Sequence, residues 1–140
     1  MDAPVQRNFQ ARTIWQRCRR CMATSRAMGA FFQKYDIYLS PVTATVAPKL
    51  GHLAGTGLSP EAFFDRFWGH APLTAVFNSS GCPAMSVPLS WTEEGLPVGV
   101  HFGAAFGNEE LLFSLAGQLE AARPWAARRP PLITEEAWTG

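Results

Sequence analysis

The spacing of apolar side chains predicts a long amphipathic helix at the start of the chain. No proline occurs between Gln6 and Tyr35, and apolar residues recur mostly three or four positions apart, as one face of a helix requires. The residues that share this face are Phe9, Trp15, Cys18, Met22, Phe31 and Phe32. We therefore expect a leading helix within residues 1–35, and Gly29 marks the place where it could break.

A short strand and an irregular loop are predicted next. Residues 36–40 form a strand-like run, which Pro41 closes because proline cannot donate a hydrogen bond within a central strand. Prolines and glycines then break both the helical and the strand period as far as Leu58. Loops of this length often carry functional residues.

A second helix is predicted to begin after Ser59. This serine is suited to the N-cap, and Pro60 to the first helical position. The helix then presents an apolar stripe of four aromatic residues, which are Phe63, Phe64, Phe67 and Trp68. We interpret the stripe as core packing in preference to an aromatic platform for a ligand.

The next segment is predicted to form a β-hairpin. Residues 84–89 and 98–102 have the composition of strands, and the residues between them, 90–97, are rich in turn formers around Glu93, Glu94 and Gly95. The two strands are therefore expected to pair.

A closing helix and a tail complete the chain. Asn108 is expected to cap a helix that runs to Leu119 and carries leucines along one face, which are Leu111, Leu112, Leu115 and Leu119. Prolines prevent this helix from continuing, so residues 124–140 are predicted to be an extended tail that Trp125 and Trp138 pin down.

Composition indicates that the chain packs as one unit. Its 140 residues are about the size of one domain, and alternating helices and strands point to α/β layering. Hydrophobic residues make up 47% of the chain and charged residues 16%, with ten Phe and five Trp, which excludes a generic disordered tail.

Charge and hydropathy name no macromolecular partner. The formal net charge is +1, so no overall field recruits nucleic acid or an anionic membrane. No stretch approaches the roughly 18 apolar residues of a membrane span, and Met1 to Asn8 lack the apolar run of a signal peptide. We expect no nucleic acid, no membrane and a cytoplasmic location.

Two closely spaced cysteines could suggest a metal or redox site. Cys18 and Cys21 are three residues apart within the predicted first helix, but a structural zinc site needs about two further ligands, and none follows at a suitable spacing. The three cysteines are therefore expected to be buried thiols, with no disulfide framework.

No familiar catalytic or cofactor motif is present. A Ser-His-Asp set can be assembled only on paper, since no serine sits in a Gly-x-Ser-x-Gly elbow. The candidate serines are Ser40, Ser79, Ser80 and Ser86, and the histidines, His52, His70 and His101, lack the i, i+4 pairing of a helical metal site. Residues 51–57 lack the Walker lysine of a phosphate loop. We expect no catalytic residue, no metal and no cofactor in this chain.

Three blocks in a fixed order nevertheless resemble a known family. Residues 36–41 with Ala47-Pro48 come first, then residues 77–88 with the pattern Asn-x-x-Gly-x-Pro-Ala, then Gly-Leu-Pro-Val-Gly at 95–99 followed by a strand, a turn and a helix with Glu-x-Leu-Leu. Together they resemble the C-terminal part of amidase-signature hydrolases. Two positions depart from that pattern, since His101 stands where the family usually has Gln and Asn108 where it usually has Glu.

The resemblance implies a fold and an activity for the complete enzyme. It implies the C-terminal portion of an α/β/α fold, with a mixed sheet and flanking helices, in which Gly99 permits a close approach of backbone. In the family, two serines, one of them in a cis peptide, and a lysine hydrolyse amides from a Gly/Ser-rich core, and this sequence contains nothing like that core. The chain is thus expected to be a single partial domain, residues 1–140, that is inactive alone.

The resemblance also suggests which residues could meet the substrate. The loop from Pro41 and the turn at residues 78–81 would wall the pocket for a small amide, with Pro41, Thr43, Asn78 and Gly81 as candidates. The alternative is a non-catalytic interaction module that forms a homo-oligomer or binds a complementary amidase segment, because losing the core would expose apolar faces. A third possibility, a small hydrolase of its own, ranks last.

Overall fold

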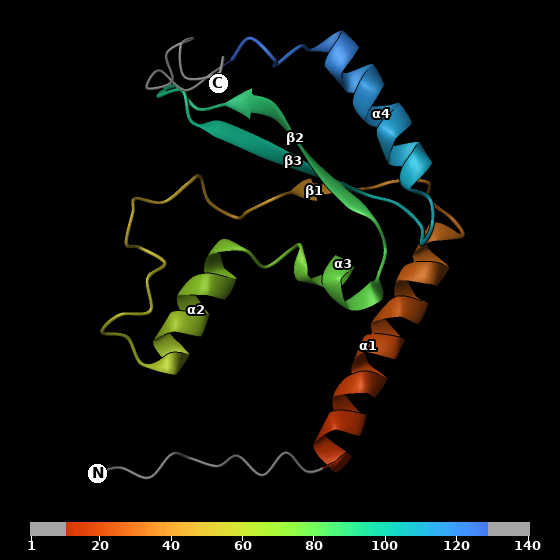
Figure 1. Cartoon of the computed structure of the whole chain (residues 1–140), viewed down its shortest axis with the longest axis vertical. Coiled ribbons are helices and arrows are strands. Elements are labelled where there is room, and N and C mark those ends of the chain that lie inside the picture. Colours follow the sequence, from red (N-terminus) through yellow and green to blue (C-terminus); the bar gives the residue numbers. More distant parts are fainter. Residues whose placement is uncertain (1–10, 129–140) are drawn as a thin grey trace, which may run out of the picture.

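A computed structural model describes residues 11–128 as four helices and three strands (Figure 1). In chain order these are α1 (Ala11–Phe32), β1 (Tyr38–Pro41), α2 (Pro60–His70), α3 (Ala75–Ser80), β2 (Ala84–Trp91), β3 (Pro97–Gly103) and α4 (Glu109–Ala122). None of the helices in this part of the chain is long and apolar enough to cross a membrane.

The three strands form one sheet with β3 in the centre, in the order β1-β3-β2. β2 and β3 form the predicted hairpin, and β1 joins the other side of β3, with Ser40 opposite His101. Pro88 lies on the edge strand β2 at a register irregularity, a position that tolerates a missing backbone donor. The α/β class with flanking helices is confirmed, and every strand pair within residues 11–128 is antiparallel.

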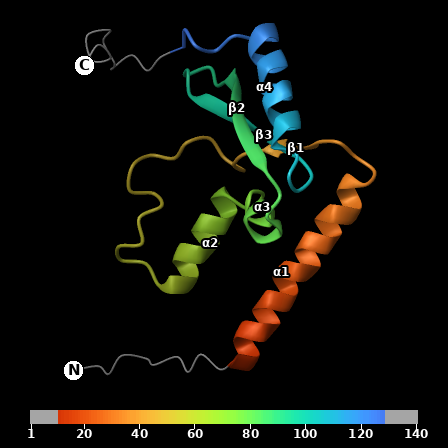
Figure 2. The same cartoon turned by 45° about the vertical axis from the view of Figure 1, so that its right-hand side comes forward.

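The two faces of the sheet are covered by different helices, α4 on one side and α3 on the other (Figures 1 and 2). On the α4 side, Val87 and Phe102 form the core with Ala104 and Leu112. The predicted leucine face of α4 is confirmed, because Leu111, Leu115 and Leu119 pack against this cluster. Few side chains are buried, so the core is thin for a chain of this length.

On the α3 side, a single aromatic ring packs on the sheet. Phe77 is buried with its ring centroid 5.2 Å from that of Tyr38 and 4.8 Å from that of His101. The helix that carries it, α3, was not predicted, because its six residues are too few to show a helical period. Gly81 ends α3 in the left-handed conformation, with φ of 76°, and the chain then enters β2.

Helix α1 continues through Gly29, so the possible break there does not occur. Its C-terminal half packs on α3, where the Ser25 hydroxyl lies 3.2 Å from the carbonyl oxygen of Ser80 and Met28 is buried. Its N-terminal half is exposed, and the prediction of buried thiols is wrong for Cys18 and Cys21. They precede the part of α1 that has a neighbouring element to cover it.

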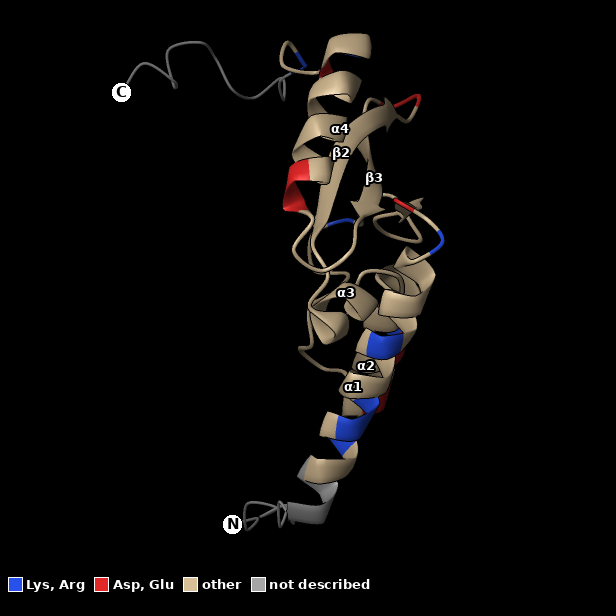
Figure 3. Cartoon of the chain, turned by 90° about the vertical axis from the view of Figure 1, so that its right-hand side faces the viewer, with Lys and Arg blue, Asp and Glu red and all other residues tan. Residues whose placement is uncertain are grey.

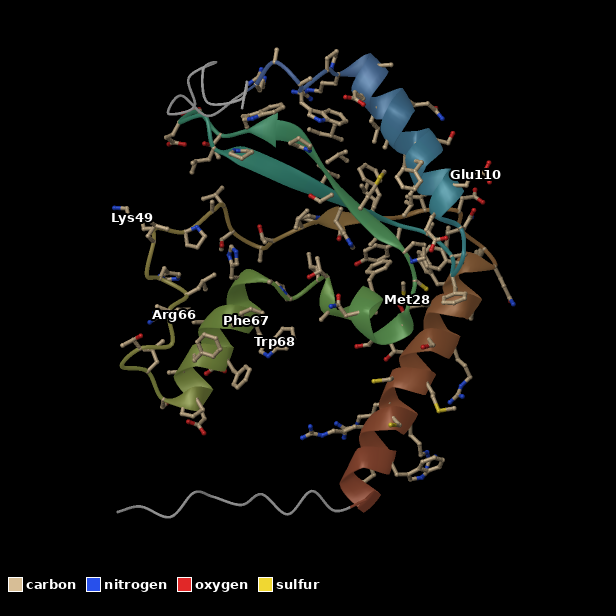
Figure 4. The ribbon with its side chains drawn as sticks, in the orientation of Figure 1. Met28, Lys49, Arg66, Phe67, Trp68 and Glu110 are labelled. Atoms are coloured by element: carbon tan, nitrogen blue, oxygen red, sulfur yellow. The ribbon has the colours of Figure 1, made fainter. Side chains whose placement is uncertain are left out.

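Helix α2 begins as predicted, but its aromatic stripe is not core. The backbone N–H of Ala62 donates to the Ser59 hydroxyl over 3.2 Å, which confirms the N-cap. No residue of α2 is buried, and Phe64 and Trp68 are 52% and 46% exposed. Figure 4 shows Phe67 and Trp68 with no other element packed over them. The core-packing interpretation is therefore wrong for the described part of the chain.

The C-terminal segment is anchored in part. Asn108 occupies the N-cap position of α4, but its side chain makes no capping hydrogen bond. Trp125 packs against the core, and the Arg128 guanidinium lies 4.0 Å from the centroid of the Trp91 ring. Trp138 and the other residues of the predicted tail beyond 128 lie outside the described residues, as does Phe9.

Candidate functional site

The predicted substrate-wall residues fall in two separate places. Thr43 lines a cavity of about 390 Å³ between the loop after β1, the end of α2 and the sheet. Gly81 lies beside Phe106, which lines a second cavity of about 430 Å³ between α1 and α3. Pro41 and Asn78 are outside both linings. The structure therefore does not bring the four candidates together.

The loop after β1 is tied to α2 by two hydrogen bonds around His70. The backbone N–H of Ala44 donates to the carbonyl oxygen of His70 over 2.8 Å, and the Thr45 hydroxyl lies 2.6 Å from His70 Nδ1. The Thr43 hydroxyl in turn donates to the carbonyl oxygen of Thr45 over 2.7 Å. These bonds fix one side of the 390 Å³ cavity.

The sheet supplies the opposite side of this cavity through Ser86 and Gly99. A Cβ on Gly99 would lie 2.8 Å from Val42 Cγ2 and 3.0 Å from the Ser86 hydroxyl, so only glycine lets the loop cross the strand here. This confirms the close approach expected of Gly99. Thr43, His70 and Ser86 are the side chains of the lining that can form hydrogen bonds.

Sequence reasoning found Thr43 but gave His70 no role in a pocket and considered Ser86 only as a nucleophile. His70 comes from a different helix, and nothing in its local sequence pairs it with Thr43. Ser86 could have been found from strand alternation, because it points away from the face on which its neighbour Val87 is buried.

A serine and a histidine do meet, but on the closed side of the sheet. The Ser40 hydroxyl lies 3.2 Å from His101 Nδ1 and 3.0 Å from the carbonyl oxygen of Pro41. Since that carbonyl can only accept, the Ser40 proton points to it when this bond forms, and His101 Nδ1–H then donates to Ser40. The imidazole is in this case a donor and not a base toward the serine.

Packing also closes this pair to a substrate. His101 is 4% exposed and the Phe77 ring meets it edge to face. Among residues 11–128 no carboxylate hydrogen-bonds to His101, so no third group orients it as in a catalytic triad. The Ser79 and Ser80 hydroxyls donate to carbonyl oxygens of α3, those of Ala75 and Phe77.

Metal binding by the usual ligand types finds no support in the described part of the chain. No group of three His, Cys, Asp or Glu side chains gathers there in an arrangement suited to a metal ion.

The buried imidazole predicts a pH-dependent stability. Burial lowers the pKa of His101 below its ordinary value of 6.5. As the pH falls below 6.5, the unfolded chain binds a proton before the folded chain does, so the free energy of unfolding decreases, whereas above 6.5 this contribution is constant. We expect urea unfolding between about pH 7.5 and 5.5 to show this loss.

A neutral replacement at the same position isolates the effect. His101→Gln, which places the residue usual in the resembled family, should flatten the pH dependence, and His52→Gln, at an exposed position, should leave it unchanged. An equal slope in His101→Gln would show that another group causes it.

Comparison with known proteins identifies the family. The Amidase family model matches residues 3–113. The chain is 42% identical over 105 residues to the putative amidase AmiC of Mycobacterium tuberculosis (strain ATCC 25618 / H37Rv), which covers 75% of this chain and 22% of that protein. It is 39% identical over 104 residues to 6-aminohexanoate-cyclic-dimer hydrolase of Paenarthrobacter ureafaciens, covering 71% and 21%.

Solved structures agree with this family. A 6-aminohexanoate cyclic dimer hydrolase complexed with substrate superposes with a TM-score of 0.79 and 28% identity, covering 91% of this chain and 28% of that one. A glutamyl-tRNA(Gln) amidotransferase subunit from Thermotoga maritima, at 24% identity and a TM-score of 0.59, shares the fold and covers 77% and 22%. The chain spans about 22% of the length of the curated relatives it matches. It belongs to the amidase family, of which it is a C-terminal segment.

Proposed function

We propose that this chain forms one wall of the substrate site of an amide hydrolase and supplies none of its nucleophilic chemistry. The observation that carries the proposal is the 390 Å³ cavity lined by Thr43, His70 and Ser86, in a chain whose one Ser-His contact within residues 11–128 is buried. Amide hydrolysis needs an activated nucleophile and an oxyanion hole, and the family resemblance assigns both to a core that this sequence lacks.

The cavity favours a small amide as substrate. Its volume lies within the range of about 300–1,000 Å³ typical of small-molecule sites, and its three polar side chains can bond an amide oxygen or N–H. Similar relatives are named for hydrolysis of the 6-aminohexanoate cyclic dimer, which is an amide of this kind. Residues 1–140 then act as one partial domain. The cytoplasm suits three cysteines that are all free thiols.

A fusion enzyme tests this proposal. The chain replaces the matching segment of the Paenarthrobacter ureafaciens cyclic-dimer hydrolase, and hydrolysis of the cyclic dimer is followed as release of new amino groups. We expect activity from the fusion, and none from the chain alone or from the truncated hydrolase alone. A fusion that folds, by circular dichroism and size, but has no activity would contradict the proposal.

Point variants in the active fusion test the cavity itself. His70→Ala should raise KM about tenfold with little change in kcat, because losing one substrate hydrogen bond of roughly 1–1.5 kcal/mol weakens binding by that factor. Ser79→Ala, whose hydroxyl bonds only the backbone of its own helix, is the matched control and should leave both constants unchanged. Equal effects of the two variants would remove His70 from the site.

A second function is favoured by the exposed stripe on α2. Phe64, Phe67 and Trp68 form an apolar surface that a second copy or the rest of an amidase could cover. If the chain alone is an interaction module, light scattering should show a size that rises with concentration, and Trp68→Gln should lower it. Phe113→Gln, at an exposed aromatic on α4, is the control. A strict monomer that unfolds cooperatively would argue against this function.

A further inference from the structure

Three sulfur-bearing side chains share one face of the N-terminal half of α1. Cys18, Cys21 and Met22 are at positions i, i+3 and i+4 of a continuous helix. At 3.6 residues per turn they fall within an arc of about 100°, and side chains at these spacings have Cβ atoms roughly 5–6 Å apart. Their sulfur atoms can therefore converge on one point above the helix surface.

This face is open to solvent. Residues 15–23 are all exposed, both thiols are free, and Met22 is 52% exposed. Sulfur atoms, yellow in Figure 4, lie along this part of α1. An exposed methionine between free thiols fills no core, so packing does not explain the group.

Positive charge borders the sulfur face. On the same helical wheel Arg17 lies beside Cys21 and Arg19 beside Met22, one on each side of the arc. Figure 3 shows the basic residues, blue, along α1. Guanidinium groups at this distance favour thiolates over thiols and offset the negative charge of a metal-dithiolate group.

We propose that Cys18, Cys21 and Met22 form a binding site for a Cu(I) ion. Two thiolates and a thioether are soft ligands, which select Cu(I), whereas structural zinc requires four ligands, and no group of three His, Cys, Asp or Glu within residues 11–128 offers them. Binding releases the two thiol protons to solvent, forms three Cu–S bonds and leaves the copper reduced. The complex carries one net negative charge, which Arg17 and Arg19 balance.

Competition for Cu(I) tests the site in the full 140-residue chain. Cu(I) is held anaerobically by the chromophoric chelator bicinchoninate under ascorbate, and the chain is titrated in. We expect one Cu(I) to be withdrawn per chain, and none by the variant with Cys18→Ser and Cys21→Ser together. Met22→Leu should weaken the affinity by about 10- to 100-fold, the range seen when a supporting group of a metal site is lost.

Matched variants and size measurements give the opposing outcomes. Cys82→Ser and Met28→Leu remove sulfur elsewhere and should leave the affinity unchanged, with circular dichroism showing that each variant folds. Copper uptake that survives loss of Cys18 and Cys21, or that depends on Cys82, would overturn the site. Unchanged affinity in Met22→Leu would overturn its third ligand, and a copper-bridged dimer in light scattering would overturn a site within one chain.

Discussion

Gly103→Ala is expected to destabilise the chain by about 3 kcal/mol or more, at the upper end of overpacking effects. Gly103 lies on the central strand β3, opposite Tyr38 and Ala84, and a Cβ built there would overlap the Phe77 ring. The ring has little room to move, because Tyr38 and His101 contact it as well. Urea unfolding followed by circular dichroism measures the loss.

Gly117→Ala is the matched control for this substitution. Gly117 lies within α4, and a Cβ there would meet nothing within 4 Å. Alanine at an open helical position should stabilise the chain by about 0.5–1 kcal/mol. If both glycine variants were equally stable, the Phe77 ring would not lie over Gly103.

Phe77→Ala is expected to cost about 3–5 kcal/mol, as truncations of buried aromatic residues do. Phe77 is the one buried residue of α3, and it joins this helix to the sheet. Domains are stable by only about 5–15 kcal/mol, so this variant should be close to unfolded at room temperature. Phe113→Ala, at a 78% exposed ring on α4, should change the stability little.

The two substitutions should not be additive. In the double variant of Gly103→Ala and Phe77→Ala, the new methyl group enters space that the ring has left. The summed single effects should then exceed the double effect by more than about 1 kcal/mol, within the range for residues in contact. Additive effects would contradict direct packing of the ring on this glycine.

Elements with strong local signals were predicted from sequence. Ser59 and Pro60 marked the start of α2, the leucine face marked α4, and turn residues marked the β2-β3 hairpin, all of which the structure contains. Each signal lies within a few residues of chain and depends on backbone conformation or on one apolar face.

Features that depend on distant partners were not predictable. The α2 stripe has the pattern of a core helix, but the residues that would cover it are not among those described, so Phe64 and Trp68 are exposed. Likewise Cys18 and Cys21 fit an apolar helical face, yet α3 covers only the later turns of α1. A periodic pattern shows which face is apolar and not what packs on it.

The candidate site shows the same division. Thr43 was found because a long irregular loop is a common place for function. Its cavity also needs His70 from the end of α2 and Ser86 from β2, which are far from Thr43 in sequence. Asn78 and Gly81 follow from the family pattern, but they shape the end of α3, away from this cavity.

If this amidase segment carries no catalytic machinery of its own, the chain alone should not hydrolyse amides. The purified chain, shown to fold by circular dichroism and freed of host amidases, is incubated with the 6-aminohexanoate cyclic dimer and with simple amides, and amine or ammonia release is measured. We expect no turnover above buffer. Turnover that disappears in Ser40→Ala, Ser79→Ala, Ser80→Ala or Ser86→Ala would show instead that the segment is an enzyme by itself, and would identify its nucleophile.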